Sequence, residues 1–127
     1  MADPIRVLIV DDEDELRSSL AKVLGRRGMK VSIAASGTAA LELLEREPHD
    51  VVVLDLKMPG IDGMETLRRM GSSHPAPRVI MLTGHGDVAA GLEAMNRQVF
   101  DFLLKPVAVD QLAARIEAAA AVRTKTP

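Results

Sequence analysis

The chain has 127 residues, with 16 basic and 18 acidic side chains, a net charge of −2 and no cysteine. Disulfides, thiolate metal sites and cysteine nucleophiles are therefore excluded, and no basic block or aromatic cluster favours nucleic-acid binding. No apolar segment approaches the length of a membrane span, and the N-terminus lacks a signal-peptide pattern. We expect a single cytoplasmic domain that binds neither nucleic acid nor membranes.

Strand-like and helix-like segments alternate along the whole chain. In order we expect strand 5–10, helix 14–27, strand 30–34, helix 36–48, strand 51–54, helix 64–70, strand 79–82, helix 87–97, strand 100–104 and helix 109–120. Gly28 should stop the first helix, and Ser36 should cap the second. His49 and His74 fall in loop-like sequence and are expected in solvent, while 124–127 is expected to be a frayed end.

This alternation predicts an α/β protein with five parallel strands, right-handed crossovers and five helices that cover both faces of the sheet. The run 51–54 is apolar and mostly β-branched, which is typical of a strand buried on both faces. No repeat, linker or inserted segment interrupts the pattern. We therefore expect one domain over residues 1–127, with its core at about 5–122.

Acidic side chains follow two of the expected strands. Asp11 and Asp12 come directly after strand 5–10, and Asp55 ends strand 51–54. Ligands bind at the carboxyl ends of the strands in open parallel sheets, and several carboxylate oxygens together suit Mg²⁺. For Asp11 and Asp12 alone, an acidic start to the following helix is the more ordinary interpretation, because acids there favour the helix dipole.

Two further polar residues stand at strand ends. Lys105 follows strand 100–104 and precedes Pro106, which keeps the chain extended at the lysine. The lysine could be an ion-pair partner for the acids, or a point charge for a transferred phosphoryl group. Thr83 follows strand 79–82; it is either an ordinary β-branched strand residue or a hydroxyl donor to a phosphoryl oxygen.

Taken together, these groups predict phosphoryl transfer, in which positioning and charge neutralisation supply most of the catalysis. Asp55 would be the nucleophile and would form an acyl phosphate. Mg²⁺ held by Asp12, Asp55 and, through water, Asp11 would neutralise the phosphoryl oxygens. Lys105 and Thr83 would bind the remaining oxygens.

The arrangement resembles the CheY-like response-regulator receiver domain of two-component signalling, from about 6 to 121. The matching motifs are Val10-Asp11-Asp12, Leu54-Asp55-Leu56-Lys57-Met58-Pro59-Gly60-Ile61-Asp62-Gly63, Leu82-Thr83-Gly84 and Phe102-Leu103-Leu104-Lys105-Pro106. The resemblance implies a flavodoxin-like, doubly wound fold with strand order 2-1-3-4-5. It also implies that a sensor histidine kinase or phosphotransfer protein phosphorylates Asp55, with Mg²⁺ or Mn²⁺ bound by the acids and by the Lys57 backbone carbonyl.

The resemblance further implies a switch, in which Thr83 moves toward the phosphoryl group and Phe102 turns inward behind it. The readout would be a downstream effector or a fused output domain, and the resemblance makes homodimerisation through the fourth and fifth helices possible. The chain could be free-standing, or it could be the N-terminal receiver of a larger DNA-binding transcription regulator. From the sequence alone, Phe102 is better interpreted as an ordinary core aromatic.

Three other functions compete with this interpretation. A phosphohydrolase with an aspartyl nucleophile needs a second acid two residues later, where this chain has Lys57. A nucleotide-binding domain needs a glycine-rich loop after the first strand, where this chain has Asp11 and Asp12. A degenerate receiver that only docks would have lost site residues, whereas all five are present. We expect a signalling phosphoacceptor and not an enzyme that turns over an external substrate.

Overall fold

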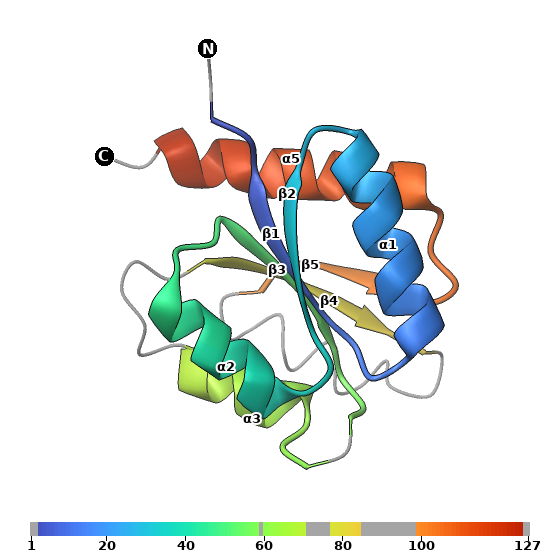
Figure 1. Cartoon of the computed structure of the whole chain (residues 1–127), viewed down its shortest axis with the longest axis vertical. Helices are drawn as coiled ribbons and strands as arrows, with labels where there is room; N and C mark the ends of the chain where they lie inside the picture. The colour runs from blue at the N-terminus through green and yellow to red at the C-terminus, as the bar shows by residue number, and fades with distance from the viewer. Residues whose placement is uncertain (1–2, 59, 71–76, 85–98, 126–127) are drawn as a thin grey trace.

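The computed structural model describes residues 3–58, 60–70, 77–84 and 99–125 (Figure 1). Its elements are β1 (Arg6–Val10), α1 (Asp14–Arg26), β2 (Lys30–Ala34), α2 (Gly37–Arg46), β3 (Val51–Asp55), α3 (Gly63–Met70), β4 (Arg78–Thr83), β5 (Val99–Leu104) and α5 (Val109–Lys125). Every expected strand is present, with ends within one residue of the prediction.

The strands form one five-stranded parallel sheet in the order β2-β1-β3-β4-β5. This is the order that the sequence resemblance implied, and it makes the fold flavodoxin-like. β3 lies at the centre, and all five of its residues are buried. A strand flanked on both sides and covered on both faces has no solvated surface, which explains its unbroken apolar sequence.

Helices cover the two faces of the sheet in pairs. In Figure 1, α1 and α5 lie on one side, and α2 and α3 lie on the other. The described residues therefore contain four helices and not the five we expected; the expected helix 87–97 falls outside the described part of the chain. At the C-terminus α5 reaches Lys125, so the expectation that 124–127 is frayed was wrong for its first two residues.

Two apolar layers follow from the alternation of side chains along the strands. On β1, Val7 and Ile9 contribute to the layer under α1 and α5, whereas Leu8 and Val10 contribute to the layer under α2 and α3. These layers fix the sheet between its helices, so the carboxyl ends of the strands form one rigid edge. None of the described helices combines the length and apolar character needed to cross a bilayer.

Local signals at the helix ends behave as their chemistry predicts. The N–H of Ala39 donates to the Ser36 hydroxyl over 3.2 Å, which confirms the predicted cap of α2. Gly28 has a φ of 89°, and the N–H of Met29 reaches back to the carbonyl of Leu24. This left-handed C-terminal motif needs a residue without a Cβ, so Gly28 ends α1 as expected.

His49 departs from the sequence-based expectation, because it is buried with an exposed fraction of 5%. It lies just before β3, at the amino end of the sheet, with its Nδ1 3.2 Å from the carbonyl oxygen of Glu47. Burial lowers its pKa from the usual value of 6.5. The prediction of a solvated histidine was wrong because the loop before β3 lies against the amino ends of β1 and β2, where His49 borders Arg6 and Lys30. His74 lies outside the described residues.

Candidate functional site

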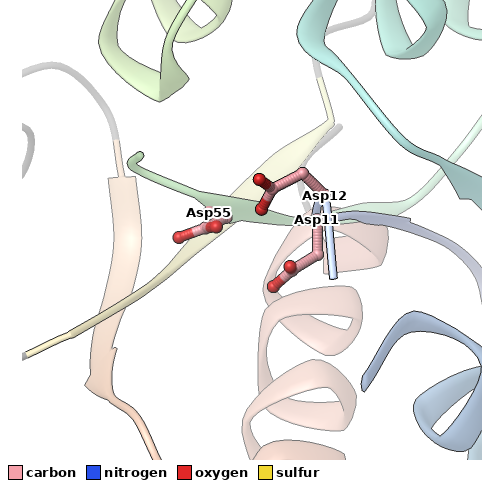
Figure 2. Close-up of side chains that lie close together, drawn as sticks. All are labelled: Asp11, Asp12 and Asp55. Atoms are coloured by element: carbon pink, nitrogen blue, oxygen red, sulfur yellow. The ribbon is translucent and has the colours of Figure 1, made fainter. Parts of the chain in front are cut away.

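The three acids of the predicted site meet at the carboxyl end of the sheet. β1 and β3 are adjacent and parallel, with Val10 opposite Leu54, so the residues that follow, Asp11 and Asp55, come side by side. Asp12 comes from the same loop as Asp11. Oxygens of the three carboxylates lie within 4.8 Å of one another, and Figure 2 shows them gathered at this edge.

Burial makes this cluster electrostatically costly. Asp11 is 1% exposed and Asp55 is 6% exposed, while Asp12 lies at the surface. Burial, together with the negative charge of Asp11, raises the pKa of Asp55 to about 6, although Lys105 opposes the shift. The ionised carboxylate of Asp55 therefore destabilises the folded chain at neutral pH. A bound cation would reduce this destabilisation.

The two carboxylate oxygens of Asp11 have different surroundings. Oδ1 accepts a hydrogen bond of 2.9 Å from the N–H of Glu13. Oδ2 is buried and accepts no hydrogen bond from the described residues, although Lys105 Nζ lies 2.9 Å away as an ion-pair partner. A buried carboxylate oxygen without a well-aligned donor is unusual in proteins. With the neighbouring oxygens of Asp12 and Asp55, it forms a hard-oxygen set that fits Mg²⁺ or Mn²⁺.

Lys105 brings the positive charge of the site from the end of β5. Its N–H donates to the carbonyl of Thr83 over 2.6 Å, which ties it to the end of β4. Its Nζ lies 2.9 Å from Asp11 Oδ2, 3.1 Å from Glu13 Oε1 and 3.5 Å from Asp55 Oδ2. Burial lowers the pKa of Lys105, but the adjacent carboxylates outweigh this and raise it overall, so the ammonium stays charged.

Thr83 and Phe102 occupy the two strands beyond Asp55. Thr83 is fully buried at the end of β4, one position past the pair formed by Asp55 and Leu82. Phe102 is half-buried on β5 and packs against the apolar layer under α2 and α3. Thr83 thus lies at the same end of the sheet as the acids, whereas Phe102 lies two residues before the end of β5, opposite Met81.

The loop after β3 carries Lys57, the residue expected to offer a backbone carbonyl to a metal. Leu56, Lys57, Met58 and Asp62 line an open depression of about 440 Å³ at this end of the sheet. The Lys57 side chain is exposed. A ligand could therefore approach the strand ends from this side.

Close packing fixes where this loop rejoins the fold. The N–H of Gly63 donates to the carbonyl of Leu56 over 2.8 Å. A Cβ on Gly63 would overlap the carbonyl oxygen of Asp55 and lie 2.7 Å from the Cα of Leu56. Only glycine fits there, so the start of α3 is pressed directly against the backbone of Asp55.

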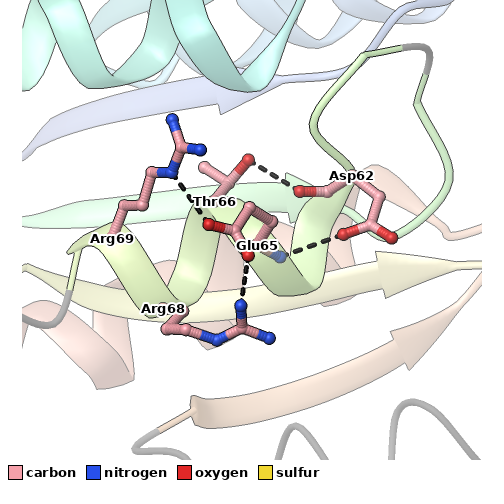
Figure 3. Close-up of polar contacts among 5 residues, drawn as sticks. All are labelled: Asp62, Glu65, Thr66, Arg68 and Arg69. Carbon is pink, nitrogen blue, oxygen red and sulfur yellow. Dashed lines mark hydrogen bonds and ion pairs between the residues drawn. The ribbon is translucent and has the colours of Figure 1, made fainter.

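Figure 3 shows the contacts that hold the start of α3 in place. The Asp62 carboxylate accepts a hydrogen bond of 2.9 Å from the N–H of Glu65, and its carbonyl accepts one of 2.8 Å from the Thr66 hydroxyl. Glu65 also forms ion pairs with Arg68 and Arg69. A capped helix at Gly63 gives the Asp55 backbone a fixed support.

Sequence reasoning missed two contacts of the site. Arg17 donates from Nη1 to the carbonyl of Asp11 over 2.8 Å, and Glu13 reaches Lys105. Arg17 carries a weak signal in the sequence, because it stands one helical turn after Asp14, with which it pairs. The Glu13 contact joins residues 92 positions apart and has no local signal.

Comparisons with known proteins agree with this arrangement. The family model described as "Response regulator receiver domain" matches residues 7–117. The response regulator MprA of Mycolicibacterium vanbaalenii is 36% identical over 124 residues, which cover 98% of this chain and 53% of MprA. The DNA-binding transcriptional regulator NtrC of Escherichia coli is 34% identical over 113 residues, covering 89% of this chain and 24% of NtrC.

Solved structures show the same fold. A response regulator receiver domain protein from Clostridium thermocellum superimposes with a TM-score of 0.89 at 34% identity, covering 94% of this chain and 97% of that one. The chain spans about half the length of MprA. Sequence, sheet order and family model agree, and the chain belongs to the family of response regulator receiver domains.

Proposed function

We propose that this chain is a signalling phosphoacceptor whose acceptor is the carboxylate of Asp55. The observation that carries the proposal is the convergence of Asp11, Asp12 and Asp55 within 4.8 Å, with Lys105 Nζ 3.5 Å from Asp55 Oδ2. Three acids and one lysine at a strand edge match what an acyl phosphate and a divalent cation need.

In the proposed reaction a carboxylate oxygen of Asp55 attacks the phosphorus of a donor. The donor is a phosphohistidine of a sensor histidine kinase or phosphotransfer protein, or a small acyl phosphate. The new P–O bond forms as the P–N or P–O bond of the donor breaks, and the electron pair leaves with the imidazole or carboxylate. Lys105 stays charged and neutralises part of the phosphoryl charge, while the Thr83 hydroxyl donates to a phosphoryl oxygen.

The residues that would hold a divalent cation are Asp11, Asp12 and Asp55, together with the backbone carbonyl of Lys57. Mg²⁺, or Mn²⁺ in its place, would supply positive charge against the phosphoryl oxygens. Asp11 contributes the buried oxygen that accepts no hydrogen bond from the described residues and is paired with the Lys105 ammonium. Ionisation of Asp55 would become easier in the same environment, because a neighbouring cation lowers the pKa of a carboxyl.

Phosphorylation would change the surface that a partner reads. About −1.5 to −2 charges arrive at the strand edge. We propose that Thr83 and Phe102 respond to this charge, since they lie on the two strands beyond Asp55. The readout would be a separate effector or a fused output domain. NtrC is a DNA-binding regulator, and the match to this chain covers about a quarter of the length of NtrC. This similarity supports a fused output domain.

Other parts of the proposal rest on the family alone. Dimerisation through the fourth and fifth helices would use the segment 87–97, which lies outside the described residues. A cytoplasmic location follows from the need to meet a kinase. Turnover of an external substrate is not expected, because Lys57 stands where an aspartyl phosphohydrolase carries its second acid.

The test is incubation with acetyl phosphate and Mg²⁺, followed by mass spectrometry of the intact chain. We expect one added phosphoryl group in the native chain and none in Asp55→Asn. Asp50→Asn makes the same chemical change at the opposite end of β3 and should still accept the group. An unchanged mass of the native chain with ample donor and time would overturn the proposal.

A further inference from the structure

The lysine of the site is shared unevenly among three carboxylates. Lys105 Nζ lies 2.9 Å from Asp11 and 3.1 Å from Glu13, but 3.5 Å from Asp55, the proposed acceptor. Asp11 belongs to the buried acidic cluster, whereas the side chain of Glu13 is 62% exposed. Glu13 thus adds a second close contact to Lys105 from outside the cluster.

The backbone presents Glu13 to the lysine from a fixed position. Its N–H donates to Asp11 Oδ1 over 2.9 Å, and its carbonyl accepts from the N–H of Arg17 over 3.0 Å. Arg17 also donates to the carbonyl of Asp11. The backbone of Glu13 is therefore held in place, with its carboxylate within side-chain reach of Lys105.

The side chain of Glu13 has no role in capping α1. Glu13 occupies the N-cap position with extended backbone, yet its side chain makes no capping hydrogen bond. N-cap residues usually stabilise a helix by accepting from the N–H groups of the first turn, and glutamate is not among the preferred caps. Here the carboxylate contacts Lys105 instead. The Glu13 side chain therefore contributes to the site through its contact with Lys105 and not by stabilising the start of α1.

We propose that Glu13 is a positioning residue that holds the Lys105 ammonium in the resting state and competes with the incoming phosphoryl group for it. The inference rests on the proposed phosphorylation of Asp55. When the acyl phosphate forms, Lys105 moves from Glu13 to a phosphoryl oxygen. The ion pair with Glu13 is then lost, and its carboxylate faces an added negative charge. Both effects favour the unphosphorylated state.

This competition slows phosphorylation without changing hydrolysis by the same factor. Lys105 has already left Glu13 in the phosphorylated chain, so the contact no longer distinguishes that state from the transition state for hydrolysis. An exposed ion pair has a small free energy, so removing it should raise the phosphorylation rate about two- to fivefold. The affinity for beryllofluoride, which imitates a phosphoryl group on Asp55 without a covalent transfer from a donor, should rise by the same factor.

Two variants of Glu13 and one control test this. Glu13→Gln removes the charge with little change of shape, and Glu13→Ser removes it while adding a good N-cap. Glu15→Gln removes an equal charge from an exposed acid two residues later, which forms no ion pair with Lys105 in the described structure. Phosphorylation by acetyl phosphate at saturating Mg²⁺, hydrolysis of the acyl phosphate and beryllofluoride affinity are measured for each.

The expected result is faster phosphorylation and tighter beryllofluoride binding in both Glu13 variants, with hydrolysis unchanged within about twofold and Glu15→Gln like the native chain. Unchanged or slower phosphorylation in both Glu13 variants would overturn the inference. An equal gain in Glu15→Gln would also overturn it, because net charge would then suffice. If the native chain neither takes a phosphoryl group nor binds beryllofluoride, the proposed function itself fails; a phosphorylated native chain with unaffected Glu13 variants refutes the inference alone.

Discussion

Both ends of the sheet carry acidic residues, but the carboxylates at the two ends have different hydrogen-bonding partners. At the amino end, Asp50 accepts a 2.9 Å hydrogen bond from the N–H of Arg6, and its backbone bonds to both Arg6 and Arg78. At the carboxyl end, three acids converge and Asp11 Oδ2 accepts no hydrogen bond from the described residues. The first arrangement holds strand ends together, whereas the second gathers three carboxylates around one lysine and leaves negative charge that a cation would neutralise.

The largest effect is expected where the backbone itself is crowded at the carboxyl end. Gly63→Ala should lower the free energy of unfolding by about 2–3 kcal/mol, because its Cβ would overlap the Asp55 carbonyl oxygen. Urea unfolding measures this. Gly25→Ala is the matched control, since nothing lies within 4 Å of a Cβ there. If both variants unfold alike, Gly63 does not support Asp55.

At the amino end, Asp50→Ala should destabilise the chain by about 2 kcal/mol, because the N–H of Arg6 loses its acceptor. Asp50→Asn keeps an acceptor oxygen and should lose less. Both are compared by urea unfolding with and without Mg²⁺. A stability difference that changes with Mg²⁺ would contradict the purely structural role assigned to this end.

Unlike the substitutions at Gly63 and Asp50, Asp55→Asn should stabilise the metal-free chain. The expected gain in the free energy of unfolding is about 1–2 kcal/mol near neutral pH. The pKa of Asp55 is raised from 3.8 to about 6 by burial and by Asp11. Between these values the folded chain binds the proton more tightly than the unfolded chain, so native stability falls as pH rises through that window. Asp55→Asn should lose this slope. If the free energy of unfolding depends on pH in the same way in both proteins, the pKa of Asp55 is not raised in the folded chain.

The smallest effect is expected at His49, and its pH dependence has the reverse sense. Burial lowers the pKa of this histidine below 6.5. The unfolded chain therefore binds a proton before the folded chain does, and stability decreases as pH falls below about 6.5. His49→Gln should flatten that part of the unfolding curve. A curve unchanged by the substitution would show that the ring is not effectively buried.

Most of the fold could be predicted from the sequence. Apolar runs and turn residues placed every strand, and Ser36 and Gly28 marked their helix ends through chemistry that acts within a few residues. Errors arose where packing of distant segments decides. His49 looked like a loop residue but is buried, and α5 continues to Lys125.

The sequence determined the alternating α/β order and put Asp11, Asp12, Asp55, Thr83 and Lys105 at the ends of strands, because local periodicity and turn chemistry act over a few residues. Only the tertiary structure decided how the charges are shared. Parallel pairing brings Asp11 beside Asp55, and the end of β5 brings Lys105 nearer to Glu13 than to Asp55. Distances between residues about ninety positions apart depend on how the strands and helices pack, which no local pattern records.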